Sequence, residues 1–386
     1  MHITRRRTRI LMISALAVGA IGCPSGVVWA SAASGAGQAP GGPAWRIVHG
    51  AKVAPNNSLN GVAAVSKQLA WAAGIAGFSS DGRVPGAPVI ERWNGRSWSV
   101  VRLPSTWPGG LARVAASSAR DAWALGQESS GTREHLLHWS GRRWGEVNFP
   151  GTQGIQYGNL GLTAAPGGAA WLIASPAASS QIFRWNGSRW RPQPYPCSAV
   201  VCTLDQISAR TASDAWAVGN YVTSTGSGAQ LALHWTGRAW HPTAMPAVKF
   251  GNLTGVFAAS RTDAWAVGVV FNTGRMLLFH WNGTGWHLVR TPAGLTVPAL
   301  GELTGITGDG AGHLWIYDFG PQTGLQASYL LYDGHRWSLL HGGMIDGQTR
   351  VIVRDVAAVP GTTTAWSVGL GFTPPIAARA RIERYS

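Results

Sequence analysis

The chain has 386 residues, of which 45% are apolar, only 12% are charged, 52 are Gly and 21 are Trp. Because helix-stabilising Glu and Lys are scarce while turn-forming Gly and large flat side chains are abundant, this composition weighs against a helical protein and favours an all-β one. The net charge is +15 and comes almost entirely from Arg, since Lys occurs only at Lys52, Lys67 and Lys249.

The first 32 residues have the three parts of a secretory signal peptide. Arg5–Arg9 is a charged start, Ile10–Gly22 is an apolar stretch too short to span a bilayer comfortably, and Ala30–Ala32 offers small residues to signal peptidase. In an alternative interpretation, Ala20–Cys23 is a lipobox and Cys23 is the acylated N-terminus of a lipoprotein. Both interpretations predict export, either free into the medium or to the cell wall, and no membrane span remains after the signal is removed.

The exported chain is still basic. Removal of the signal peptide takes away four arginines and no acid, which leaves a net charge of +11. A basic protein outside a cell associates with anionic envelope polymers, acidic glycans or nucleic acid whether or not they are its ligand. We therefore predict no specific nucleic-acid partner from the charge.

A repeat of about 50 residues runs through the rest of the chain. An Ala-Trp or Leu-Trp step recurs with spacings of 52, 48, 45, 49, 50 and 51 residues. An aliphatic residue precedes each step by nine or ten residues, and downstream an aromatic residue is followed five residues later by Trp. The Trp residues of the step are Trp71, Trp123, Trp171, Trp216, Trp265, Trp315 and Trp366.

Each repeat unit predicts four short strands. In one unit we expect them around residues 253–258, 264–268, 276–281 and 286–289. Asn-Gly or Asp-Gly between the third and fourth strands supplies the positive backbone angles of a tight hairpin. An Asp before the Ala-Trp step is expected to cap amides in the turn between the first and second strands; it occurs at Asp121, Asp214 and Asp263. Four-stranded meanders at this period are propeller blades, so the sequence predicts a seven-bladed all-β propeller.

The two ends of the chain predict how the ring closes. The seventh unit stops at Arg384–Ser386, which matches Arg92–Asn94 of the first, so its fourth strand is missing. Trp45–Val48 resembles the fourth strands of other units and precedes Trp98 by one period. We predict a monomeric propeller over residues 44–386, with 44–50 as the closing strand of blade seven and 33–43 as a flexible leader; this pairing covers an edge that would otherwise invite aggregation.

The unit Asp263-Ala264-Trp265-Ala266-Val267-Gly268, with His280-Trp281-Asn282-Gly283 and Trp286 after it, resembles the Trp-rich propeller repeat of secreted actinobacterial proteins. More distantly it is similar to kelch, galactose-oxidase-like and Asp-box propellers. The resemblance spans Trp45 to Ser386 and implies the fold and export. It carries over no catalytic or metal-binding residue, because the Ser-x-Asp-x-Gly pattern of the Asp-box, a sialidase arginine triad and a copper-ligand pattern are all missing.

Candidate binding residues follow from the loops. The loop between the second and third strands lies on the same face as the linkers between blades, and both vary in length here; we call this the variable-loop face. Variable loops on a rigid scaffold are the usual place for recognition, and flat aromatic rings there can stack on sugars. The Trp columns are expected to be core, with Trp107 outside them. The aromatic residues expected on this face are Phe78, Trp107, Tyr157, Tyr195, Tyr221, Phe250, Phe271, Phe319 and Phe372.

Polar residues give fewer indications. Arg113, Asp205 and Asp355 lie in expected innermost strands, where they form either a ligand site in the central channel or a set of mutual ion pairs. Cys197 and Cys202 should pair as a disulfide in an oxidising compartment. We predict no metal site and no cofactor. His138, His234 and His280 share one repeat column and are expected to be structural.

These observations favour a non-catalytic binding module at the cell envelope. Its partner would be a polysaccharide or another protein, held by stacking and hydrogen bonding on the variable-loop face. One alternative is a glycan hydrolase or lyase with its site at the channel mouth, and a second is a structural wall-associated protein retained by charge. Propellers carry all three kinds of function, so the fold does not choose among them.

Overall fold

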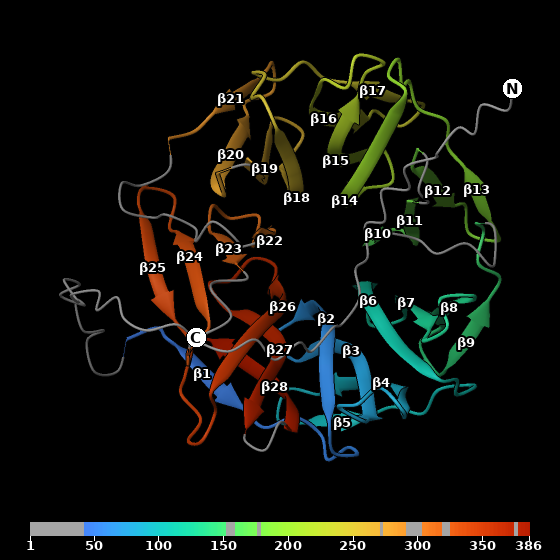
Figure 1. The fold of residues 1–386 in the computed structure, drawn as a ribbon, viewed down its shortest axis with the longest axis vertical. Helices are drawn as coiled ribbons and strands as arrows, with labels where there is room; N and C mark the ends of the chain where they lie inside the picture. The colour runs from blue at the N-terminus through green and yellow to red at the C-terminus, as the bar shows by residue number, and fades with distance from the viewer. Residues whose placement is uncertain are drawn as a thin grey trace, which may run out of the picture. The chain divides into compact units, whose positions relative to one another are not determined.

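Seven four-stranded antiparallel sheets surround a central axis in the computed structural model (Figure 1). The structure describes residues 42–151, 159–175, 179–270, 273–290, 303–318, 325–373 and 377–386. Residues 43–386 form one unit, which is the predicted seven-bladed propeller. The predicted signal peptide and nearly all of the leader lie outside the described residues. Within the described ranges, no helix is long and apolar enough to cross a membrane.

Each blade contributes one strand to each of four concentric layers. The innermost strands are β2 (Asn57–Ser66), β6 (Gly109–Ser118), β10 (Asn159–Ala165), β14 (Val201–Thr211), β18 (Gly251–Ser260), β22 (Leu303–Gly308) and β26 (Arg350–Ala358). The second strands are β3 (Leu69–Phe78), β7 (Asp121–Glu128), β11 (Ala169–Ser175), β15 (Asp214–Val222), β19 (Asp263–Val270), β23 (Leu314–Asp318) and β27 (Ala365–Thr373). The third strands are β4 (Pro85–Trp93), β8 (Glu134–Trp139), β12 (Gln181–Trp185), β16 (Gly228–Trp235), β20 (Arg275–Trp281), β24 (Ser328–Tyr332) and β28 (Ala377–Tyr385). The outermost strands are β5 (Trp98–Val100), β9 (Trp144–Val147), β13 (Trp190–Pro192), β17 (Trp240–Pro242), β21 (Trp286–Leu288), β25 (Trp337–His341) and, in blade 7, β1 (Trp45–Val48).

The blades are held together by tryptophan packing. Trp71 on β3 of blade 1 contacts Trp139 and Trp144 of blade 2, with ring centroids 5.0 and 5.2 Å apart. The same arrangement recurs where the second-strand Trp of blades 2, 4 and 7 meets the Trp pair of the next blade. A buried Trp removes about 150–250 Å² from water, or roughly 4–6 kcal/mol gross as an upper bound. The predicted core role of these columns is confirmed.

The N-terminal strand closes the ring as predicted. β1 pairs antiparallel with β28, in register from Trp45 opposite Tyr385 to Val48 opposite Ile382. Trp45 is buried and stacks on Tyr329 of blade 6, with ring centroids 4.1 Å apart. It therefore fills the position that outermost-strand Trp residues fill in other blades, although it comes from the opposite end of the chain.

A repeated glycine permits a bulge in the inner strands. β2 shifts register between Leu59 and Gly61 opposite β3, and five other innermost strands shift at the corresponding point. A Cβ at Gly74 would lie 1.9 Å from the carbonyl oxygen of Ser58, so only Gly fits there. Blade 3 has Ala174 at this position, and β10 pairs with β11 without a shift. At Gly74 the missing side chain is thus what lets the two backbones approach this closely, although blade 6 has the same register shift opposite Asp318.

The hairpins between third and fourth strands form as predicted. Gly95 has a φ of 96°, and the carboxamide oxygen of Asn94 accepts hydrogen bonds from the amides of Arg96 and Ser97 at 2.9 and 3.0 Å. Gly187, Gly283 and Gly334 have φ values of 97°, 94° and 89°. The Asn-Gly and Asp-Gly turns predicted from the sequence therefore form hairpins on the face of the ring opposite the variable loops.

Replacing Trp45 by Ala should lower the free energy of unfolding by roughly 3–5 kcal/mol, because it removes a buried ring from the seam between blades 6 and 7. Urea unfolding followed by tryptophan fluorescence measures this. Arg46→Ala is the matched control: Arg46 is exposed on the same strand, donates to the carbonyl oxygen of Ser386 at 2.7 Å, and should cost about 1 kcal/mol or less. Equal effects of the two changes would mean that β1 does not contribute to the core.

Candidate functional site

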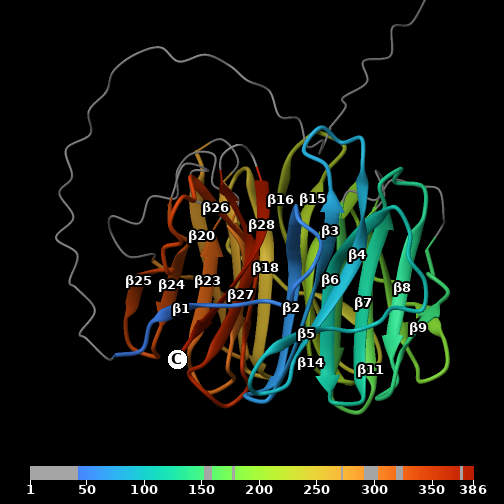
Figure 2. The same cartoon turned by 90° about the horizontal axis from the view of Figure 1, so that it is seen from below.

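Blade 4 carries a pocket on the variable-loop face. Figure 2 shows the ring from the side, with the strands of the blades running between its two faces. The pocket has a volume of about 400 Å³ and lies between the linker entering blade 4, the edge of β16 and the linker leaving for blade 5. Its lining is Pro196, Cys197, Ser198, Ala199, Cys202, Tyr221, Ala229, Gln230, Leu231, Ala232, Pro242, Thr243, Ala244, Met245 and Ala247.

One wall of the pocket is fixed by a disulfide. Cys197 and Cys202 are bonded, as the sequence predicted. Cys202 lies at the start of β14, where its amide donates to Ser179 Oγ at 3.1 Å and its carbonyl accepts from the amide of Ser180 at 2.9 Å. The bond therefore ties the entering linker, which carries Cys197, to a well-anchored strand.

Two predicted aromatic residues lie at this wall. Tyr221 on β15 is opposite Cys202 in the β14–β15 register and lines the pocket. Tyr195 packs against the same core and donates from its hydroxyl to the carbonyl oxygen of Ser180 at 2.8 Å. Burial raises the pKa of Tyr195 to about 12, so its hydroxyl stays protonated. Tyr221 thus borders the cavity, while Tyr195 supports the linker.

The opposite wall is held by a side chain of the third strand. Gln230 on β16 accepts from the amide of Val248 at 3.2 Å and donates to its carbonyl at 3.1 Å. Thr243 is also used internally, because its hydroxyl donates to the carbonyl of Ala232 and accepts from Trp286 Nε1. Two of the polar side chains in the lining are therefore committed to holding the linker at residues 243–250.

Three exposed apolar residues lie close in sequence to the lining of the pocket, and we call Val200, Val222 and Phe250 the apolar rim. Val200 and Val222 each follow a lining residue and are joined by a hydrogen bond from the amide of Val200 to the carbonyl of Val222 at 3.0 Å. Phe250 is 50% exposed and has a φ of 60°. A positive φ is a true outlier for a bulky residue. Lys249 Nζ lies 5.1 Å from the centre of the Phe250 ring.

Trp107 does not present an exposed ring, so that expectation is wrong. Its side chain is 6% exposed and stacks on His135, with centroids 3.9 Å apart and planes 10° apart. The ring is buried because the linker from blade 1 to blade 2 packs down onto β8. A pattern search that finds a Trp outside the repeat columns cannot tell a surface ring from one that anchors a linker.

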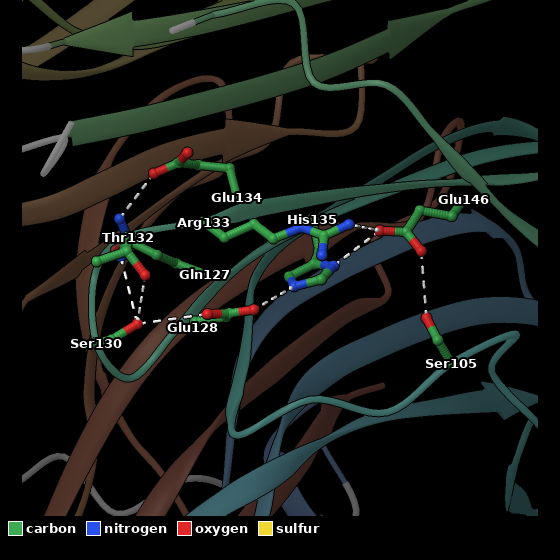
Figure 3. A network of polar contacts seen from close by, with 9 residues as sticks. All are labelled: Ser105, Gln127, Glu128, Ser130, Thr132, Arg133, Glu134, His135 and Glu146. Carbon is green, nitrogen blue, oxygen red and sulfur yellow. Dashed lines mark hydrogen bonds and ion pairs between the residues drawn. The ribbon is translucent and has the colours of Figure 1, made fainter. Parts of the chain in front are cut away.

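A polar network surrounds His135 (Figure 3). Its Nδ1 lies 2.9 Å from Glu146 and its Nε2 lies 3.4 Å from Glu128. Arg133 and Ser105 also contact the carboxylate of Glu146, at 3.6 and 3.3 Å. Since Ser105 and Trp107 belong to the linker, this network fixes the linker onto blade 2. No group of three or more His, Cys, Asp or Glu in the described part of the chain has a geometry that could hold a metal ion.

The remaining predicted aromatic residues fall elsewhere. Phe78 and Phe372 belong to a small apolar cluster of blades 1 and 7, and Arg350 lies 5.1 Å from the Phe372 ring. Tyr157, Phe271 and Phe319 lie outside the described residues. Of the aromatic residues expected on the variable-loop face, Tyr221 lines the pocket, Tyr195 packs behind its wall and Phe250 belongs to the apolar rim.

Asp355 joins three blades in the central channel. Its carboxylate accepts from the amides of Val62 and Val356, both at 2.9 Å, and from the hydroxyl of Tyr317 at 2.8 Å. Burial raises the pKa of Asp355, although these hydrogen bonds and the charge of Arg113 oppose the rise. Asp205 lies at the bulge of β14 in blade 4, which is not a neighbour of blade 7 in the ring. The bonds of Asp355 are those of a structural tie between blades.

The aspartates before the Ala-Trp step bind histidine rather than the turn amides that we expected. Asp214 lies 2.8 Å from Nε2 of His234, whose ring stacks on Trp216 with centroids 4.1 Å apart. Asp121 and Asp263 make the same contact with His138 and His280. The sequence contained this signal, because blades with Asp before the step have His opposite the Trp. Of the four blades without it, three have Arg over the Trp ring, at Arg92, Arg184 and Arg384, and blade 6 has Leu331 opposite Trp315.

Comparison with known proteins supports the fold alone. No protein family matches the sequence, and no curated protein matches it. The solved structures that are similar to this chain include U3-55K (TM-score 0.56, 11% identity, covering 89% of this chain and 100% of that one), YCF48 bound to D1 peptide (0.52, 13%, 88% and 94%), and SapL1 lectin in complex with alpha methyl fucoside (0.51, 10%, 77% and 98%). At these identities the likeness is one of architecture.

Acid should weaken the contact between Asp214 and His234. Burial raises the pKa of Asp214, but hydrogen bonds from His234 and Arg210 outweigh it and hold the pKa below its ordinary value. A depressed carboxylate pKa stabilises the fold above the unfolded pKa of about 3.9, and that stabilisation is lost as pH falls through the folded value. Asp214→Asn should therefore unfold more easily than wild type at pH 7, by about 1–3 kcal/mol, and the gap should close near pH 3.

Urea titrations at the two pH values measure this difference. Asp263→Asn is the matched control, because the Asp263 side chain is 42% exposed against 1% for Asp214. Exposed pairs contribute about 1 kcal/mol or less. If Asp214→Asn is less stable than wild type by the same free energy at both pH values, the ionised carboxylate of Asp214 does not stabilise the fold through His234.

Proposed function

We propose that this chain is a non-catalytic extracellular binding module that takes a polysaccharide or a protein against its variable-loop face, at the blade 4 pocket. The observation that carries the proposal is the pocket itself together with its apolar rim. A volume of about 400 Å³ is within the usual range for ligand sites. Tyr221 in the lining and Phe250 at the rim are the flat side chains that would stack on a sugar ring or pack against a partner.

The backbone at Phe250 supports a recognition role. A non-glycine residue in the left-handed region costs roughly 1–2 kcal/mol, and strain of this kind gathers at functional sites. Here the strained residue carries a large apolar ring that is 50% exposed to solvent. An exposed ring held at a cost in stability is expected where a partner covers it.

The disulfide and the N-terminal sequence support an extracellular compartment. A disulfide at the wall of the pocket is stable in an oxidising environment. We propose export under the direction of residues 1–32, as in the actinobacterial repeat proteins that the unit resembles, with retention near the envelope aided by the net positive charge. Among propellers of similar fold, YCF48 has been solved with D1 peptide and SapL1 lectin with alpha methyl fucoside, so this architecture serves binding in other proteins.

Neither alternative function has comparable support. A hydrolase at the channel mouth needs a pair of carboxylates at a set separation, whereas Asp355 is engaged with three donors from blades 1, 6 and 7. Retention by charge alone gives no reason for an uncharged pocket with an apolar rim. The binding module accounts for both.

Binding should depend on the two aromatic residues of the pocket and its rim. The purified protein would be screened on glycan arrays, cell-wall fractions and peptide arrays, at about 0.15 M and 0.5 M salt to separate specific contacts from charge. Tyr221→Ala and Phe250→Ala should each weaken binding about tenfold or more, as truncation of a central aromatic anchor does. Leu288→Ala, an exposed apolar residue on β21 that does not line the pocket, is the control and should bind as wild type.

Binding that is abolished by salt and indifferent to both aromatic changes would refute the proposal and favour a scaffold retained by charge.

Replacing Phe250 by Gly should weaken binding without lowering the stability of the fold. Phe250→Gly relieves the positive φ but adds the backbone entropy cost of Gly, about 0.5–1 kcal/mol, so the melting temperature should stay level or rise. Binding should fall as far as in Phe250→Ala. Differential scanning calorimetry gives the first quantity and the binding assay the second. A clear drop in melting temperature would show that the ring serves the fold.

A further inference from the structure

The third strand of blade 4 is longer than its outer neighbour. β16 runs from Gly228 to Trp235, whereas β17 pairs only with its last three residues, from Leu233 opposite Pro242 to Trp235 opposite Trp240. Above this pairing the amide of Thr243 still donates to the carbonyl of Ala232 at 2.9 Å. The chain then leaves β16 and is next held at Val248, by the side chain of Gln230.

Backbone groups of β16 consequently face the pocket. In a strand, backbone groups of alternate residues point to the same side. The carbonyl of Ala232 points outward to Thr243, so the amides and carbonyls of Gln230 and Gly228 point outward as well, away from β15. Among the described residues, no backbone or side-chain group bonds to these outward groups. Residues 229–232 and 244–247 both line the gap, so the pocket lies where a longer fourth strand would continue along β16 beyond β17.

The walls of this gap suit a peptide better than a sugar. No charged residue lines it. Gln230 and Thr243 spend their polar groups on the linker, so sugar hydroxyls would find few partners in them. An extended peptide binds to backbone donors and acceptors along a strand edge and needs apolar surface for its alternate side chains. Leu231, Met245 and the disulfide supply that apolar surface here. Lys249, beside Phe250 at the rim, adds one positive charge.

We infer that the blade 4 pocket binds an extended, mainly apolar peptide segment carrying an acidic residue, by adding it as a strand to the edge of β16 at residues 228–232. This inference rests on the proposed function and names the ligand class for the same pocket. At about 3.3 Å per residue the edge accommodates a peptide of roughly four or five residues. Main-chain hydrogen bonds supply the affinity, and the apolar walls select the side chains.

A backbone-modification scan tests the mode of binding. A displayed library of random heptapeptides is selected on the purified protein, and the strongest binder is synthesised with each amide N-methylated in turn. Because only alternate amides of an added strand face its partner, methylation should weaken binding about tenfold or more at alternate positions and little at those between. A scan without this alternation, or a selection that yields no binder, overturns the inference.

Two substitutions of Gln230 test whether the backbone amide of residue 230 donates a hydrogen bond to the bound peptide. Gln230→Ala removes the side chain that holds the linker but keeps the outward N–H, while Gln230→Pro removes both. Proline is tolerated at an edge where the N–H faces outward, and circular dichroism verifies the fold. The Pro variant should bind the selected peptide about three- to tenfold more weakly than the Ala variant, the contribution of one hydrogen bond. Equal affinities of the two variants would count against strand addition.

The outcomes separate this inference from the function on which it rests. Glycan binding that depends on Tyr221, without peptide binding, overturns strand addition and leaves the binding module in place. Absence of any ligand that depends on Tyr221 or Phe250 overturns both. Peptide binding with alternation, weakened by Tyr221→Ala, supports both.

Discussion

The packing of one second-strand Trp against two Trp residues of the next blade is the interaction on which this molecule depends. Trp71 with Trp139 and Trp144 is the pattern, and it recurs around the ring. Since each blade is a twisted sheet with two apolar faces, no blade can bury its surface alone. The ring must therefore be complete, and this explains why the last blade recruits Trp45 from the other end of the chain.

The same requirement accounts for the polar pairs beside the Trp column. A second-strand Trp has one face toward a neighbouring blade, while its cross-strand partner covers another side. His234 and Arg184 both fill that place, one stacked on Trp216 with a carboxylate behind it and one lying over Trp171 as a cation. Asp and His therefore change together from blade to blade. The recurring Asp and His residues resemble a catalytic or metal-binding set in the sequence, but each Asp contacts only the His of its own blade.

The sequence predicted the fold far better than the candidate site. The blade count and the hairpins at Asn-Gly or Asp-Gly depend on patterns that recur from blade to blade, so each is signalled several times over. The closing strand is signalled by its match to the fourth strands of the other blades. Trp107 and Asp214 were misjudged because the partner of each lies on another strand, at a distance that spacing does not show. The pocket was beyond reach for a related reason: it is a gap left where residues 243–248 depart from β16, and a gap has no residue pattern of its own.

Blade 4 also shows how a rigid repeat acquires a site without disturbing its core. The tryptophan layers fix the part of each blade where third and fourth strands pair, and in blade 4 they leave residues 228–231 of the third strand without a partner in β17. The course of the linker then decides what happens to that edge. In blade 4, a disulfide holds one linker to β14 and Gln230 holds the other away from β16. Both devices lie outside the repeat columns, so they leave the tryptophan packing unchanged, and together they hold the two linkers that line the pocket.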